Sequence, residues 1–149
     1  MRRSAHANAA FLAFALIWAG MLIGVSFLAT PVKFAAPGLT LPVALEVGHV
    51  TFHLFSRVEW TFGAALLLAA MFGTSRLRLG IAVLLAIVLA LQAAWLLPVL
   101  DERVAAVVAG APLPPSSHHT IYAAAEGAKI LLLGIASFTV LRRVGGDKG

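Results

Sequence analysis

The sequence predicts an all-α fold, an integral membrane four-helix bundle, from its composition and its apolar segments. Of the 149 residues, 61% are hydrophobic and 11% are charged, which leaves too little polar surface for a soluble domain. A helix needs about 20 mostly apolar residues to cross a bilayer. Four almost wholly apolar segments fit this need and leave room for one transmembrane domain over 1–149. They are 9–30, 58–73, 79–98 and 120–141.

The first two helices are predicted over about 9–30 and 43–73. Pro31 is expected to end the first helix, because proline lacks the backbone N–H that the next turn needs. The second helix begins after Pro42 and ends near Gly73, and both residue types are typical of helix ends. It is longer than a bilayer requires. Its amphipathic first dozen residues are therefore expected at the headgroup level or inside the bundle.

The third and fourth helices are predicted over about 79–98 and 119–141. Pro98 is expected to end the third helix. The segment that follows, 100–110, is amphipathic and is expected to form a short helix along the membrane interface, closed by Gly110. A Pro- and Ser-rich stretch then precedes the fourth helix, as is typical of a helix start.

The basic residues predict the orientation of the bundle. The positive-inside rule places the end richer in Lys and Arg in the cytoplasm, so both termini are expected to be cytoplasmic in an inner (plasma) membrane. The net charge of +5 is explained by these flanks and indicates no nucleic-acid partner. The N-terminus also resembles a secretory signal peptide, but its apolar run is as long as a full span. The cytoplasmic group is Arg2, Arg3, Arg76, Arg78, Arg142, Arg143 and Lys148, against Lys33 and Arg103 at the other end.

Pairs of small residues four positions apart predict close contacts between helices. The sequence leaves open whether these contacts lie within the chain or between subunits. The expected partner is the lipid bilayer, and a second copy or another membrane protein is the alternative that these pairs leave open. The pairs are Gly20 with Gly24 and Ala123 with Gly127.

Ionisable and aromatic side chains form one stripe on the second helix and one on the fourth. At about 100° per residue, the members of each stripe fall within about 80° of one another. Both helices run in the same direction, so both stripes begin at the same membrane level and predict one shared site. Glu59 lies on the opposite side of the second helix. The stripes are Glu46, His49, His53, Arg57 and Trp60, and His119, Tyr122 and Glu126 with Lys129 at the edge.

Charges within a membrane are expected to pair, because each costs roughly 2.5–3.5 kcal/mol at the centre of a span. We predict an i, i+3 pair between Glu126 and Lys129 and a pair between Arg57 and Glu126 across helices. A fixed ion-pair network that only sets the helix register is the alternative interpretation. The candidate ligand-binding residues are Arg57, Glu59, Tyr122, Glu126 and Lys129.

Histidine spacing on the second helix suggests a metal site. His49 and His53 have the i, i+4 spacing of two ligands for zinc, copper or iron, and Glu46 with His49 has the Glu-x-x-His spacing. Haem held by one histidine from each stripe is a second option. Histidines that only contact headgroups or loop carbonyls are a third. The absence of cysteine excludes thiolate ligands. The candidate metal ligands are Glu46, His49, His53, His119 and Glu126.

Three segments resemble the four-helix membrane family typified by transmembrane-protein-205-like proteins. The first, 18–34, reads WAGMLIGVSFLATPVKF, and 92–103 reads QAAWLLPVLDER with a proline before an amphipathic segment. The third, HHTIY at 118–122, is similar to the start of that family's last helix. The histidine pair of the second helix has no matching position in the family. The resemblance therefore implies a fold and a membrane location, without a settled activity or site.

These features predict a multi-pass membrane protein that binds a metal ion, haem or a small ligand near the outer face. We expect a binding protein and not an enzyme. Two other classes remain open. One is a structural or assembly subunit of a membrane complex, and the other is a small permease or proton-coupled transporter component.

Overall fold

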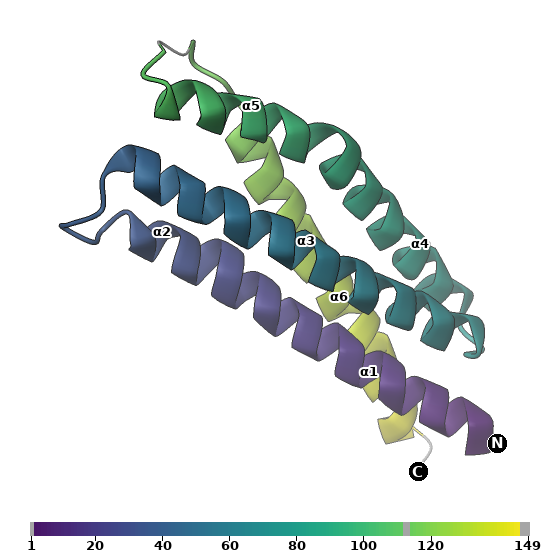
Figure 1. Ribbon diagram of the computed structural model, residues 1–149. Helices are drawn as coiled ribbons and strands as arrows, with labels where there is room; N and C mark the ends of the chain where they lie inside the picture. Colours follow the sequence, from purple (N-terminus) through teal and green to yellow (C-terminus); the bar gives the residue numbers. More distant parts are fainter. Residues whose placement is uncertain (1, 112–113, 147–149) are drawn as a thin grey trace.

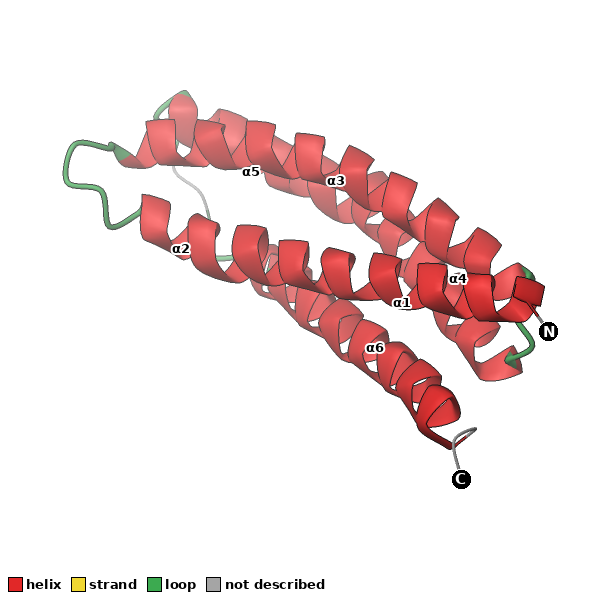
Figure 2. Cartoon of the chain, turned by 90° about the horizontal axis from the view of Figure 1, so that it is seen from below, coloured by secondary structure: helices red, strands yellow, loops and turns green. Residues whose placement is uncertain are grey.

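The protein is a bundle of four long helical rods in the computed structural model, which describes residues 2–111 and 114–146 (Figure 1). Side chains are described from Ala5 to Arg142 within these ranges. Both chain ends lie at one end of the bundle, as the antiparallel order of the rods requires (Figures 1 and 2). Lys148, which entered the orientation argument, lies outside the described residues.

The first rod runs through Pro31, so the predicted helix end there is wrong. It consists of α1 (Arg2–Leu22), the π-helical segment η1 (Ile23–Ala29) and α2 (Thr30–Lys33). The N–H of Thr30 donates to the carbonyl of Val25, five residues back. A proline ring clashes with the carbonyl four residues before it, and the widened π turn relieves this clash without ending the helix.

The third rod has the same construction around Pro98. It consists of α4 (Arg76–Leu91), the π-helical segment η2 (Gln92–Leu96) and α5 (Leu97–Val108). The N–H of Leu97 donates to the carbonyl of Gln92, again five residues back. The predicted interfacial helix at 100–110 is therefore the end of this rod. Gly110, at φ +72°, follows it as predicted, in the left-handed conformation that glycine adopts most easily.

The second and fourth rods are uninterrupted helices. They are α3 (Leu41–Met71) and α6 (His118–Gly146). Pro42 lies in the first turn of α3, where a missing N–H costs no hydrogen bond. With the first and third rods they make four helices that are long and apolar enough, by length and composition, to cross a membrane. For the described residues, the prediction of an all-helical chain with four helices long and apolar enough to cross a membrane is confirmed.

The rods pack around one apolar core. α1 contacts α3 and α6, and α4 contacts the same two helices, so α3 and α6 face each other across the centre. Phe11, Trp18 and Leu22 of α1 are fully buried against this core. Large apolar side chains such as Leu131 and Phe72 are exposed on the outside, as expected for a surface in contact with lipid.

Two glycines of α3 permit close packing. A Cβ at Gly48 would collide with the ammonium group of Lys33, and one at Gly63 would lie 3.0 Å from Leu89 Cδ1. Gly20 and Gly24 differ, because a Cβ at either position would meet no atom within 4 Å. The contact predicted for this pair therefore does not lie within the chain.

Arg78 is buried between α1 and α4 near the end that carries the termini. Its side chain is 2% exposed, and its Nη1 donates to Asn8 Oδ1 at 2.6 Å. The guanidinium carbon lies 5.6 Å from the centre of the Phe11 ring. Arg78 therefore links the first rod to the third through side-chain contacts. It is also one of the basic residues from which the membrane orientation is predicted.

Candidate functional site

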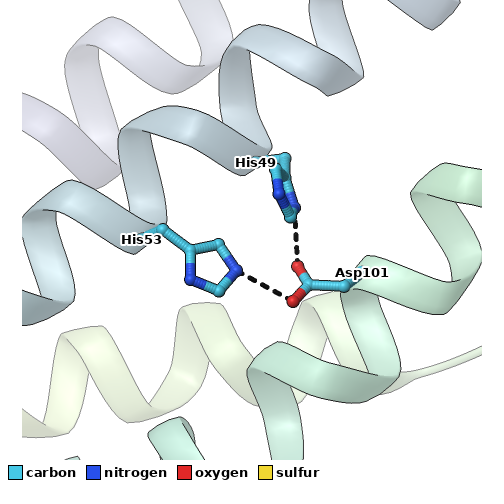
Figure 3. A group of neighbouring side chains, drawn as sticks. All are labelled: His49, His53 and Asp101. Atoms are coloured by element: carbon cyan, nitrogen blue, oxygen red, sulfur yellow. Dashed lines mark hydrogen bonds and ion pairs between the residues drawn. The ribbon is translucent and has the colours of Figure 1, made fainter.

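Two histidines of α3 and an aspartate of α5 form a compact group (Figure 3). His49 Nδ1 lies 2.8 Å from Asp101 Oδ1, and His53 Nε2 lies 2.8 Å from Asp101 Oδ2. One ligand atom from each residue lies within 4.8 Å of the other two. Since ligand atoms about 2.0–2.2 Å from one metal ion lie roughly 3 Å apart, the group can contract around an ion with small movements. We call it the histidine–aspartate group.

Helix geometry places these three residues together. The i, i+4 spacing stacks His49 over His53 on one face of α3, with ring centres 4.5 Å apart. α5 contacts α3 and brings Asp101 to this face. The side chains remain accessible, with exposed fractions of 41% for His49, 40% for His53 and 30% for Asp101. Water or a further ligand can therefore complete a coordination sphere, as at open three-ligand metal sites.

The sequence analysis does not predict Asp101 as a ligand, and three of the five predicted metal ligands, Glu46, His119 and Glu126, lie outside the group. The sequence predicts the segment containing Asp101 along the membrane interface, because Pro98 is typical of a helix end, but α5 continues the rod. Its amphipathic pattern indicates a face that packs on another helix, but the π turn before Pro98 hides which residues of the third rod share that face. Glu46 is exposed and does not belong to the group, and Glu126 belongs to a second, buried cluster.

The second cluster consists of Glu59, Glu126 and Lys129 at the centre of the bundle. Lys129 Nζ lies 2.7 Å from Glu126 Oε1 and also forms an ion pair with Glu59 Oε1. Glu126 and Lys129 are 0% exposed and Glu59 is 1% exposed. The predicted Glu126–Lys129 pair is therefore present. Glu59 completes it from α3, because its side of that helix faces the centre of the bundle. We call these residues the buried triad.

Three neutral side chains donate hydrogen bonds to the buried triad. Trp18 Nε1 donates to Glu59 Oε1 at 3.0 Å. Ser26 Oγ donates to Glu126 Oε2 and Gln92 Nε2 donates to Glu126 Oε1, each at 2.8 Å. Ser26 lies in η1 and Gln92 in η2, so both π-helical segments deliver a partner to the same carboxylate. π-helical turns occur frequently at functional sites, and here they mark Glu126.

The predicted pairing of Arg57 with Glu126 is wrong. Arg57 is exposed, whereas Glu126 is fully buried with the partners just described. The stripe of α3 that contains Arg57 and Trp60 turns away from the centre, and the buried face includes Gly48, Phe55 and Glu59 instead. The single shared site that we expected is therefore divided into two groups.

Two adjoining cavities lie between these groups. The first, of about 250 Å³, is lined by His49 and Asp101. The second, of about 290 Å³, is lined by Ser26 and Glu126. Both are lined by Thr30, Phe34, Phe52, His119 and Tyr122, so these residues form their common wall.

His119 and Tyr122, both predicted site residues, therefore stand between the two groups. His119 is exposed near the start of α6, and Tyr122 is buried one turn deeper, with its ring centre 5.2 Å from that of Phe52. Glu126 lies a further turn along the same helix. The cavities thus extend from the end of the bundle that carries the histidines towards the buried triad.

Comparison with known proteins finds no matching family model, no matching curated protein and no matching solved structure. The resemblance to transmembrane-protein-205-like proteins therefore stays a prediction. Function has to be argued from the two groups and the cavities between them.

Proposed function

We propose that the chain is a multi-pass protein of an inner membrane that binds one divalent transition-metal ion on the histidine–aspartate group, at the outer face. The observation that carries the proposal is the convergence of one ligand atom each from His49, His53 and Asp101 within 4.8 Å. Two imidazoles and one carboxylate suit zinc, iron, cobalt or manganese. The orientation rests on the basic residues, which place the opposite end of the bundle in the cytoplasm.

A single ion suits this site better than haem. Haem held by one histidine from each stripe would have to fit between His49 of α3 and His119 of α6, which line the same cavity. This cavity, at about 250 Å³, is smaller than the roughly 300–1,000 Å³ of pockets for drug-sized ligands. His119 lines this cavity and is the residue available to approach a bound ion from α6.

Metal titration of the full chain in mild detergent tests the proposal. Wild-type protein is expected to bind one Zn²⁺ or Co²⁺, measured by calorimetry and by the visible spectrum of the cobalt form. Binding is expected to weaken as the pH falls through the histidine range, because protons compete with the metal for the imidazoles. The His49→Ala/His53→Ala double variant is expected to abolish binding, and Asp101→Asn is expected to weaken it at least tenfold.

Matched controls separate the site from the rest of the chain. Glu102→Gln removes the neighbouring carboxylate, which is exposed on the same helix, and His6→Ala removes a histidine far from the site. Both controls are expected to bind like wild type. Wild-type protein that binds neither ion would contradict the metal site. So would variants of the histidine–aspartate group that bind as well as wild type, and either result would favour a structural subunit.

A proton-coupled membrane component is the second candidate function. The observation that favours it is the cavity lined by Glu126, which gives a buried charged residue a route towards one end of the bundle. This candidate depends on the buried triad and not on the metal.

A further inference from the structure

The buried triad contains one cation and two carboxylates. Among the side chains that the structure describes, 5–111 and 114–142, Lys129 is the single Lys or Arg within ion-pairing distance of Glu59 or Glu126. With both carboxylates ionised, the triad has one excess negative charge at the centre of a bundle that is apolar enough to cross a membrane. Burial of an uncompensated charge is strongly unfavourable, and such a group takes up a proton instead.

We propose that the buried triad is a proton-binding site, which holds one exchangeable proton on the Glu59–Glu126 pair. One proton makes the triad neutral. Because two interacting carboxylates titrate as a unit, the proton belongs to the pair and not to either residue alone. This inference goes beyond the metal site and does not rest on it.

The groups around Glu126 can accommodate either protonation state. The hydroxyl of Ser26 donates to the ionised carboxylate and can accept from the protonated acid, since a hydroxyl does both. Gln92 Oε1 is a buried acceptor without a hydrogen-bond partner among the described residues, so a turn of its amide would present an acceptor to the acid. Two neutral partners that can reverse their roles suit a site that gains and loses a proton.

Glu126 is the member of the triad through which the proton exchanges. It lines the second cavity, together with Ser26, whereas neither Glu59 nor Lys129 lines either cavity. The titratable residues that share this cavity are Tyr122 and His119, both on α6. His119 lies seven residues before Glu126, about 10 Å along the helix axis. The route therefore runs from exposed His119 to buried Glu126. Among the side chains described, the charged groups that form ion pairs within the triad are its own three members.

Infrared spectroscopy of the metal-free full chain in lipid tests the protonation state. Wild-type protein at neutral pH is expected to show the carbonyl stretch of a protonated carboxylic acid, shifted by D₂O. Glu126→Gln and Glu59→Gln each remove the excess charge, so each is expected to lose this band. Glu102→Gln is the matched control and is expected to keep it. The same loss of the band is expected in each of the two triad variants. The test can therefore still be made if one of them does not fold.

Exchange kinetics test the route. Ala123 lines the second cavity, and Ala123→Phe is expected to slow hydrogen–deuterium exchange of the band at least tenfold without removing it. Ala124→Phe is the control, because Ala124 is exposed and lines neither cavity. Equal exchange rates in the two variants would overturn the route.

Two other outcomes would overturn the proton site itself. An acid band that survives both triad substitutions would assign the proton to another residue. Wild-type protein without an acid band, and stabilised by Na⁺ over K⁺, would show that a bound sodium ion balances the charge. Since all these measurements omit transition metals, a failed metal titration and a failed proton test remain distinguishable.

Discussion

At the scale of single residues, the buried triad has one ammonium group and two carboxylates. Substitution of the lysine is therefore expected to affect stability differently from substitution of a glutamate. Removal of Glu126 leaves Lys129 paired with Glu59, a one-to-one pair. Removal of Lys129 leaves two carboxylates next to each other without a cation. The loss of a partner from a buried pair costs about 3–5 kcal/mol, and the penalty is greatest where an uncompensated charge remains.

Lys129→Met is therefore expected to destabilise the protein by about 3–5 kcal/mol near neutral pH, and Glu126→Gln by clearly less. The loss of folding stability caused by Lys129→Met should grow as the pH rises. Without the ammonium group, the folded state must keep both carboxylates protonated, and it then binds more protons than the unfolded state. Thermal unfolding of both variants in detergent between pH 5 and pH 8 measures this. Losses of stability that are equal in the two variants and independent of pH would mean that the triad is open to water.

At the scale of helices, the spacing of residues within one helix explains which parts of the site could be predicted from sequence. The i, i+4 spacing of His49 and His53 and the i, i+3 spacing of Glu126 and Lys129 correctly placed each pair on one helix face. Spacing within a helix does not say which neighbour that face meets. Asp101 and Glu59 were missed as partners for this reason, although Glu59 was already a candidate residue.

Proline was the second source of error. Pro31 and Pro98 were expected to end helices, but a π turn before each proline lets the rod continue. A π turn also shifts the residues that follow to a different face, so no single helical period describes the third rod. The four spans could be predicted because their length and apolarity do not depend on that period.

The contact between α2 and α3 gives a prediction at this scale. Lys33 lies over Gly48 and lines the first cavity, and a side chain at position 48 would displace its ammonium group. Gly48→Leu is expected to destabilise the protein by about 1–3 kcal/mol, as overpacking usually does, and to weaken metal binding at neighbouring His49. Gly20→Leu is the comparison and should change neither, because its Cβ meets open space. Calorimetric metal titration and thermal midpoints of both variants check this.

At the scale of the whole molecule, the arrangement of the rods fixes which segments share an end but not which way the bundle faces. The loop at 34–40 and the described residues 109–111 and 114–117 lie at the end opposite the termini (Figure 1). The histidine–aspartate group lies towards that end. The basic residues predict that the end with the termini is cytoplasmic.

Reporter fusions test this orientation. Fusions after Gly149 and at the turn after Met71 are expected to report a cytoplasmic location. Fusions within 34–40 and within 109–117 are expected to report an external one. An external C-terminus together with cytoplasmic 34–40 would reverse the orientation and place the histidine–aspartate group at the cytoplasmic end. Mixed reports from one end of the bundle would contradict the four-span arrangement itself.

The ion pair between Glu59 and Lys129 also has a consequence for how the chain is made. Lys129 follows Glu59 by 70 residues, so the ribosome produces the carboxylate first. At synthesis rates of about 5–20 residues per second, Lys129 is synthesised roughly 4–14 s after Glu59. During this time α3 either remains with the insertion machinery or enters the lipid with a protonated carboxyl group. A ribosome that stalls before α6 leaves a chain in which the carboxyl group of Glu59 on α3 lacks its lysine partner.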